Sequence, residues 1–331
     1  MSEAGLRGPL LASVSRSFYL SIRILPRKIQ KPIALAYLLA RASDTIADSA
    51  DAPAPIRLRH LANFEEMIRT GELGALPELQ REIRPGDAGE RALIDQLQPC
   101  LAWLAKLEAF DRAEVTAVLH EIIRGQSLDL QRFADLDHIT ALATAADLDE
   151  YAYLVAGCVG EFWTRVCVHH IPQSARLPLD ELSRLGRSFG QGLQLVNILR
   201  DLPSDLRNGR CYLPEDELLA SGASAATILT DPASARSVFT RWLLKATTHL
   251  DDGFRYIQGM RSARLRVACF LPWYLGVRTL ALLHKQPPLE VVAKVKVPRS
   301  TVRTALLLGL PIAVSNRPLR AIRERLRSAT P

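Results

Sequence analysis

Two pairs of aspartates are the residues of this sequence whose spacing most clearly predicts chemistry. Asp44 and Asp48 are four residues apart in an apolar segment, and so are Asp201 and Asp205. At about 100° per residue, each pair lies on one face of a helix, where two carboxylates repel each other. A divalent cation would remove that repulsion, and Mg²⁺ prefers a few carboxylates together with substrate phosphates. We therefore predict a magnesium site, with Mn²⁺ as the alternative ion, whose ligands are these four aspartates.

Further polar side chains fall on the same two helix faces, in register with the aspartates: Tyr37, Arg41, Gln194 and Asn197. A single pair of this kind would be read as an ordinary solvated face. Two pairs on apolar helices favour instead two helices that face a cavity and grip a diphosphate through bridging metal ions. Pro203 lies between the second pair and is expected to bend or end that helix.

The elements that must position these residues are helices throughout, because apolar residues recur at three- and four-residue spacing. We expect helices over residues 30–50, 56–70, 90–107, 110–126, 147–168, 180–206, 233–259 and 262–284. A capping box at residues 147–150 is expected to open a helix near Tyr151. Strand patterns and long linkers are almost absent. The sequence therefore predicts an all-α protein with a single domain over residues 1–331.

Composition and charge narrow the class of protein. The chain has 331 residues, 48% of them hydrophobic and 23% charged, which is typical of a globular protein. No apolar run is long enough for a membrane span, and five dispersed cysteines favour a reducing cytoplasm. Residues 241–331 hold 17 Lys and Arg against 4 Asp and Glu, which favours an anionic partner. Nucleic acid is not expected, because no binding motif accompanies these charges.

Several motifs together resemble the squalene/phytoene synthase family, whose members are head-to-head prenyltransferases with an all-α isoprenoid-synthase fold. The matching segments include both aspartate motifs and four others: Ser15-Arg16-Ser17-Phe18, Gly125 to Asp129, Tyr151 to Gly157, and Gly209-Arg210 to Pro214. Cys269 to Pro272 and Ala293 to Val297 resemble squalene synthase more than phytoene synthase. The resemblance implies a helical bundle around a central cavity.

The resemblance also implies a reaction and roles for residues. Two farnesyl diphosphates would condense to presqualene diphosphate, which NADPH would then reduce to squalene. Tyr151 would handle the proton of the first step, and Gly157 and Gly160 would let the prenyl chain approach the backbone. Diphosphate and substrate contacts are assigned to one set of residues: Ser15, Arg16, Ser17, Tyr37, Arg41, Gln194, Asn197, Arg200 and Arg210. NADPH contacts are assigned to Lys294, Lys296 and Arg299.

Other outcomes stay open at this point. The condensation could proceed without a reductant, as in dehydrosqualene and phytoene synthases, or could stop at presqualene diphosphate. A cyclising terpene synthase and a non-catalytic binder of prenyl lipids are further alternatives. The segment around Arg299 is expected to be a loop, and the basic tail over residues 302–331 is expected to rest on an anionic membrane surface. We expect a cytoplasmic monomer, peripheral on the inner face of the membrane.

Overall fold

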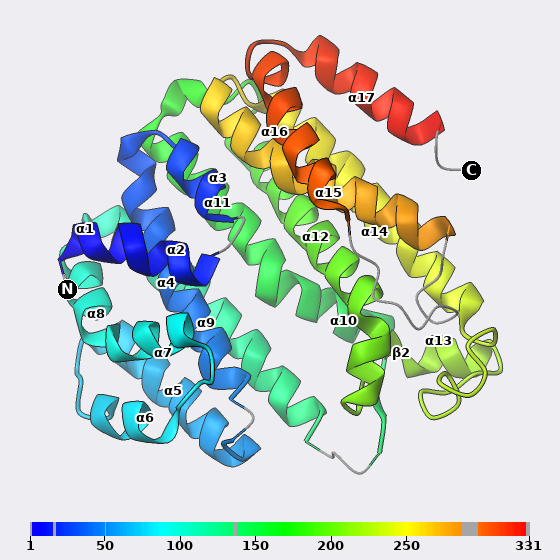
Figure 1. Ribbon diagram of the computed structural model, residues 1–331, viewed down its shortest axis with the longest axis horizontal. Coiled ribbons are helices and arrows are strands. Elements are labelled where there is room, and N and C mark those ends of the chain that lie inside the picture. Colours follow the sequence, from blue (N-terminus) through cyan, green and yellow to red (C-terminus); the bar gives the residue numbers. More distant parts are fainter. Residues whose placement is uncertain (1, 16–17, 50, 135–137, 286–296, 329–331) are drawn as a thin grey trace. The chain divides into compact units, whose positions relative to one another are not determined.

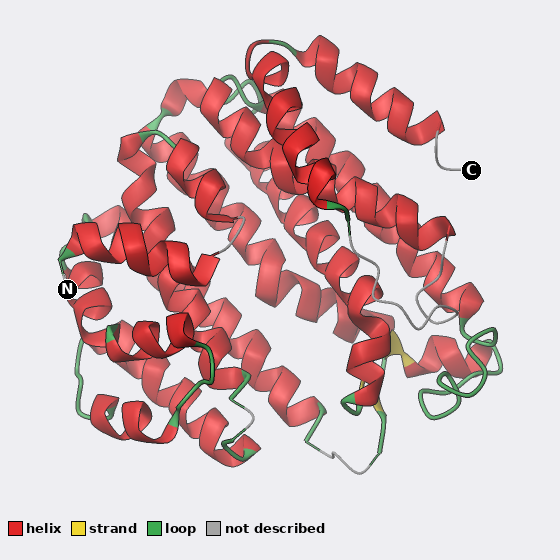
Figure 2. Cartoon of the chain, in the orientation of Figure 1, coloured by secondary structure: helices red, strands yellow, loops and turns green. Residues whose placement is uncertain are grey.

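A computed structural model describes residues 2–15, 18–49, 51–134, 138–285 and 297–328. These residues are predominantly helical (Figures 1 and 2), which confirms the predicted all-α class. The chain divides into two compact units, Met1–Gln131 and Arg132–Pro331. The single domain over residues 1–331 stays a prediction.

The first unit is built around a long, largely buried helix, α4. Leu35, Leu38, Leu39 and Ile46 of this helix are fully buried, and α4 packs against α5, α7 and α8. The elements of this unit are α1 (Glu3–Gly5), η1 (Leu6–Leu10), α2 (Leu11–Ser15), α3 (Phe18–Ile24), α4 (Arg27–Ala47), α5 (Ala54–Thr70), α6 (Leu76–Glu82), α7 (Ala88–Asp95), α8 (Leu97–Ala105) and α9 (Ala109–Arg132). The predicted helix 90–107 is thus two helices that meet at Gln96.

The second unit is built around α12, which packs against α11, α14 and α15. Figure 1 shows α12, α14 and α15 running side by side. The elements are β1 (Thr140–Leu142), α10 (Ala145–Ala152), η2 (Tyr153–Gly157), α11 (Cys158–His170), η3 (Pro172–Ser174), α12 (Leu179–Arg207), β2 (Arg210–Pro214), α13 (Glu215–Ala220), α14 (Arg236–Gly259), α15 (Ala263–Lys285), α16 (Arg299–Val314) and α17 (Asn316–Ser328).

Two local expectations were wrong, and a third is corrected in part. Helix α12 runs through Pro203 to Arg207, so the helix does not end between the two aspartates; a bend at Pro203 stays a prediction. The capping box joins Thr144 and Asp147, so the helix begins at Ala145 rather than near Tyr151. A short parallel sheet, β1 with β2, was missed, because each strand is too short to show an alternating pattern.

Glycines hold α11 and η2 unusually close to α12. A Cβ atom on Gly160 would lie 1.9 Å from the carbonyl oxygen of Gly186, and one on Gly190 would lie 2.2 Å from that of Ala156. Real side chains cannot occupy such space, so the two backbones touch because these positions are glycine. Gly160 therefore serves helix packing, which corrects the expectation that it opens the backbone to a prenyl chain.

Helix α15 qualifies as a candidate membrane span by length and composition, although the sequence had indicated none. More than half of its most apolar window, 56%, is nevertheless buried inside the protein. The core helix of a globular protein has the same property. All five cysteines are free and buried.

Candidate active site

The first aspartate pair lies on the solvent-accessible face of α4, a helix whose other faces are buried. Tyr37, Arg41 and Asp44 are partly exposed and Asp48 is exposed, whereas Ala42, Ser43, Thr45 and Ile46 are buried. Asp48 ends the helix, and its N–H donates to the carbonyl of Asp44 at 2.8 Å. The predicted polar face of this helix is confirmed.

The Asp44 carboxyl group combines an exposed surface with an environment that disfavours its charge. Its side chain is 46% exposed, so a ligand can reach it. Burial by the surrounding protein, followed by the charge of Asp48, raises its pKa from 3.8 to about 7. Arg41, whose Nη1 lies 3.8 Å from Asp44 Oδ2, opposes that rise only in part because it also pairs with Glu90. A cation at this carboxyl group would stabilise its ionised form.

Gln126 on α9 is a contact that the sequence analysis missed. Its Nε2 donates to Asp44 Oδ1 at 2.6 Å, and the residue is buried. Among the described residues, its Oε1 has no hydrogen-bond partner although it is buried. The motif Gly125 to Asp129 had been noticed, but one sequence does not show that this amide reaches across to α4.

The remaining predicted residues of the first unit form contacts with the backbone or lie outside the described residues. The hydroxyl of Tyr37 donates to the carbonyl of Val14 at 3.2 Å. The hydroxyl of Ser15 is buried and donates to the carbonyl of Leu11 at 2.5 Å. Arg16 and Ser17 lie outside the described residues. The substrate roles of these four residues stay predictions.

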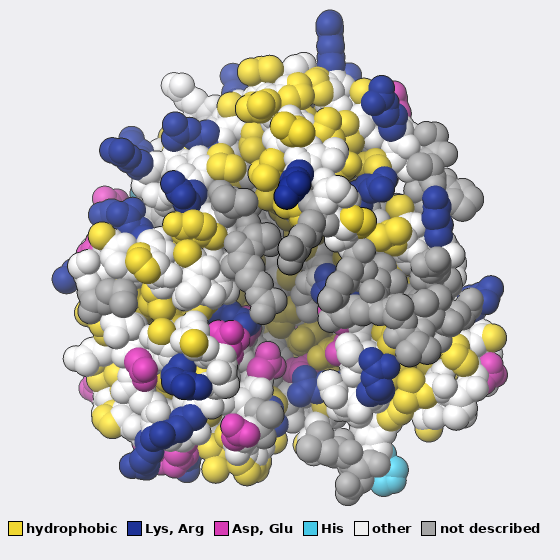
Figure 3. Space-filling view, in the orientation of Figure 1, with side chains coloured by type: hydrophobic (Ala, Val, Ile, Leu, Met, Phe, Trp, Pro, Cys, Tyr) yellow, Lys and Arg dark blue, Asp and Glu magenta, His cyan; other side chains and the backbone are white. Residues whose placement is uncertain are grey.

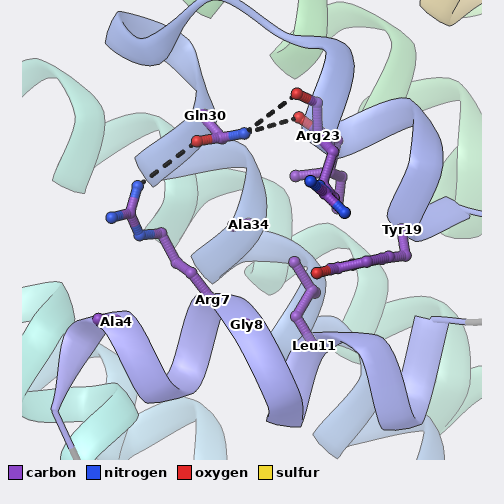
Figure 4. Close-up of a pocket in the computed structure, with 9 residues that line it drawn as sticks. Ala4, Arg7, Gly8, Leu11, Tyr19, Arg23, Gln30 and Ala34 are labelled. Atoms are coloured by element: carbon purple, nitrogen blue, oxygen red, sulfur yellow. Dashed lines mark hydrogen bonds between the residues drawn. The ribbon is translucent and has the colours of Figure 1, made fainter.

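A separate cavity of about 360 Å³ lies between the N-terminal helices and the start of α4. Figure 4 shows Gln30 between the side chains of Arg7 and Arg23, with Tyr19 and Leu11 on the opposite side. Arg7 Nη1 donates to Gln30 Oε1 at 3.5 Å, and the guanidinium carbon of Arg23 lies 5.6 Å from the centre of the Tyr19 ring. The lining of this cavity therefore combines two guanidinium groups with an aromatic and an aliphatic side chain.

Helix α12 presents the second aspartate pair in the same manner as α4. Gln194, Asp201 and Asp205 are partly exposed and Asn197 is exposed. The other sides of the helix are buried, and they consist of Leu195, Val196, Ile198, Leu199, Leu202 and Leu206. Since α12 continues through Pro203, Asp201 and Asp205 are separated by one regular helical turn.

Arg200 and Asp201 form a bidentate ion pair. Arg200 Nε lies 3.1 Å from Asp201 Oδ1, and Arg200 Nη2 lies 2.5 Å from Asp201 Oδ2. Both side chains keep part of their surface open, 30% and 24% respectively. A cation bound at Asp201 would compete with this pair and would leave the Arg200 guanidinium available to an anionic ligand.

The segment that follows α12 places an aromatic pair beside its end. Gly209 has a φ of 78°, a left-handed conformation that glycine adopts without strain and that turns the chain into β2. Tyr212, in this strand, stacks on Tyr151 of α10 with ring centres 5.0 Å apart. Arg210, a predicted diphosphate ligand, is the first residue of β2 and is partly exposed.

Of the three residues predicted to contact NADPH, the structure describes only Arg299. Lys294 and Lys296 lie outside the described residues. Arg299 begins helix α16, with Pro298 as its N-cap residue, so the expectation of a loop at that residue was wrong. Binding of NADPH stays a prediction.

The donor set of each unit fits a magnesium ion shared with a phosphate ligand. Within the described part of the chain, no three His, Cys, Asp or Glu side chains cluster into a protein-only metal site. Mg²⁺ typically uses one or two carboxylates and completes its shell with water and substrate phosphates. Each aspartate pair supplies two carboxylates, and the partnerless Gln126 Oε1 could accept a hydrogen bond from a metal-bound water.

The chain is similar in sequence and in fold to known proteins. The chain is 28% identical to the squalene synthase of Saccharomyces cerevisiae over 280 residues, which are 83% of this chain and 60% of that protein. It therefore spans less than two thirds of that relative's length. The solved structure of TcSQS with the ligand BPH1237 matches with a TM-score of 0.79 at 21% identity, over 98% of this chain and 92% of that one.

A second solved structure, a dehydrosqualene synthase with a bound ligand, matches with a TM-score of 0.63 at 21% identity, over 94% of this chain and 98% of that one. Both structures share the helical fold of this chain. The family model described as squalene/phytoene synthase matches residues 11–301, which include both aspartate pairs and Tyr151. The chain belongs to the squalene/phytoene synthase family.

Proposed function

We propose that this protein condenses two farnesyl diphosphates head to head into presqualene diphosphate, and that NADPH then reduces this intermediate to squalene. Family membership and the similarity to a curated squalene synthase support the proposal. The main observation behind the proposal is an arrangement of charged residues that α4 and α12 have in common. On each helix an accessible aspartate pair, with a guanidinium beside its first member, lies on an otherwise buried surface.

The charged residues of the two helices suit the departure of a diphosphate. Asp44, Asp48, Asp201 and Asp205 would hold Mg²⁺, which when bound neutralises negative charge developing on the leaving diphosphate. Arg41, Arg200 and Arg210 would donate hydrogen bonds to diphosphate oxygens, a geometry that planar guanidinium groups match in a bidentate manner. Arg200 would give up its pairing with Asp201 as it does so.

Tyr151 is the candidate for proton transfer in the first step. Its stacking on Tyr212 holds the ring in one orientation, and an edge-to-face contact of Tyr212 with Phe133, at 5.2 Å between ring centres, extends this aromatic cluster. Aromatic rings also exclude water, which would otherwise capture an allylic cation.

A reaction without reductant is the second candidate, because a solved dehydrosqualene synthase has the same fold over 94% of this chain. In that case the rearranged cation would lose a proton where squalene synthesis requires a hydride. Residues of α4 and α12 would act identically in the two reactions. Only the product separates them.

The test is incubation of the purified protein with labelled farnesyl diphosphate and Mg²⁺, with and without NADPH, followed by extraction of hydrocarbons. Squalene formed only with NADPH would support the proposal. Dehydrosqualene in both incubations would replace it with the second candidate, and presqualene diphosphate alone would limit the enzyme to the first step. Cyclic products, or no release of diphosphate, would contradict it. Geranylgeranyl diphosphate in a parallel incubation tests the preferred chain length, and an Asp44→Asn, Asp201→Asn double variant provides the inactive control.

A further inference from the structure

Helix α16 is apolar on two opposite sides, and only one of them is covered. Ala305 and Ile312 are buried, and a Cβ atom on Gly309 would lie 3.2 Å from Val267 of α15. On the opposite side, Leu307 is 71% exposed and Leu310 is 74% exposed. Val314, one turn further along, is 84% exposed, and apolar side chains gather over this part of the surface in Figure 3. We call Leu307, Leu310 and Val314 the outer face of α16.

A buried arginine fixes the helix in this orientation. Arg266 of α15 is 1% exposed, and its guanidinium donates to the carbonyls of Ile312 and Ser315, each at 2.8 Å. A third bond joins it to the carbonyl of Met260 at 3.2 Å. These bonds hold the C-terminal end of α16 against α15. The outer face is therefore exposed on a helix whose position is fixed by hydrogen bonds to α15.

Positive charge surrounds the outer face. Arg303 is exposed one turn before Leu307, and Arg317 and Arg320 are exposed on α17. From residue 299 to 327 the sequence contains seven arginines and a single acidic residue, Glu324. Exposed aliphatic side chains beside clustered arginines are typical of surfaces that lie in the interface of an anionic bilayer.

Helix α17 is docked on the second unit, so its other arginines keep a defined position. Arg323 Nη2 lies 2.8 Å from Asp251 Oδ1, and its guanidinium carbon lies 4.4 Å from the centre of the Phe254 ring. Leu319 and Leu326 are buried beside it. These contacts occupy the inner side of α17 and leave Arg317, Arg320 and Arg325 exposed.

We propose that the outer face of α16, with the arginines around it, binds the surface of a membrane that contains anionic lipids. A second copy of this chain fits the face less well, because an isologous contact would bring the arginine clusters of both copies together. Since anionic lipids concentrate in the cytoplasmic leaflet, this would place the protein on the inner face of the membrane. The proposal is independent of the reaction proposed above.

The test measures sedimentation of the full chain, without substrate, with vesicles of phosphatidylglycerol and phosphatidylcholine and with vesicles of phosphatidylcholine alone. We expect binding to the mixed vesicles that weakens at high salt, and at least tenfold weaker binding to phosphatidylcholine alone. A Leu307→Ser, Leu310→Ser variant should lose at least tenfold in affinity for the mixed vesicles. An Arg317→Gln, Arg320→Gln variant should lose about fivefold per charge.

Leu219→Ser is the matched control, because Leu219 on α13 is 62% exposed and lies outside this surface. It should bind the mixed vesicles as the wild type does, and circular dichroism should show that all variants fold. Equal losses in the Leu219 and Leu307 variants would overturn the proposal, and so would absence of wild-type binding. Self-association of the wild type that the serine variant abolishes would assign the face to a second copy instead.

Discussion

Replacing Asp44 with asparagine should stabilise the metal-free protein at pH 8. The wild-type carboxylate repels Asp48 and is desolvated by the protein around it, which is why its pKa rises from 3.8 to about 7. Asparagine has nearly the same shape, removes the charge, and keeps an oxygen that can accept the hydrogen bond from Gln126. A residue whose removal stabilises a protein is typical of a binding site, where function opposes stability.

The sign and size of the effect follow from proton binding. Below pH 3.8 Asp44 is protonated in both the folded and the unfolded chain and contributes nothing. Between about pH 4 and pH 7 only the folded chain keeps this proton, so its stability falls as the pH rises, and above pH 7 the loss is complete. A shift of this size corresponds to about 4 kcal/mol. Because the side chain is 46% exposed and water screens its charge, we expect on the order of 1 kcal/mol.

Thermal unfolding in EDTA at several pH values provides the measurement. The Asp44→Asn variant should unfold about 2 °C above the wild type at pH 8, and the difference should disappear near pH 4. Excess Mg²⁺ should stabilise the wild type more than the variant, since a cation needs the ionised carboxylate. Asp51→Asn, at an exposed residue in the turn after α4, is the control and should show neither effect. A variant that is equally destabilised at pH 8 and pH 5 would refute this reasoning.

Three further predictions concern other residues of the two units. Gln126→Ala, which removes the donor to Asp44, should weaken binding of Mn²⁺ about tenfold in titrations followed by electron paramagnetic resonance; unchanged affinity would contradict its positioning role. Gly160→Ala, whose new methyl group would lie 1.9 Å from a backbone oxygen of α12, should destabilise the protein by several kcal/mol in urea unfolding, whereas Gly8→Ala, with no atom within 4 Å, should not. Tyr151→Phe retains the stacked ring and should slow formation of presqualene diphosphate more than tenfold, while conversion of supplied presqualene diphosphate is much less affected; equal losses in both assays would leave Tyr151 a packing residue.

Helical periodicity predicted most of the fold, because a buried helix face requires apolar residues at regular spacing wherever it packs. The accessible polar lines of α4 and α12 were predicted correctly for that reason. The errors fall where local patterns are weak or ambiguous. Pro203 does not end its helix, which continues to Arg207, and the strand β2 lies in a motif that was noticed only for its residue types.

The sequence by itself determined the all-α class, the family motifs and the two aspartate faces, because each depends on residues close together along one helix. The tertiary structure determined which residues of different helices come into contact. It brought Gln126 of α9 to Asp44 of α4, packed Gly160 of α11 against Gly186 of α12, and turned one apolar side of α16 outward. Such contacts join residues distant in sequence, and no local spacing rule specifies which of them will meet.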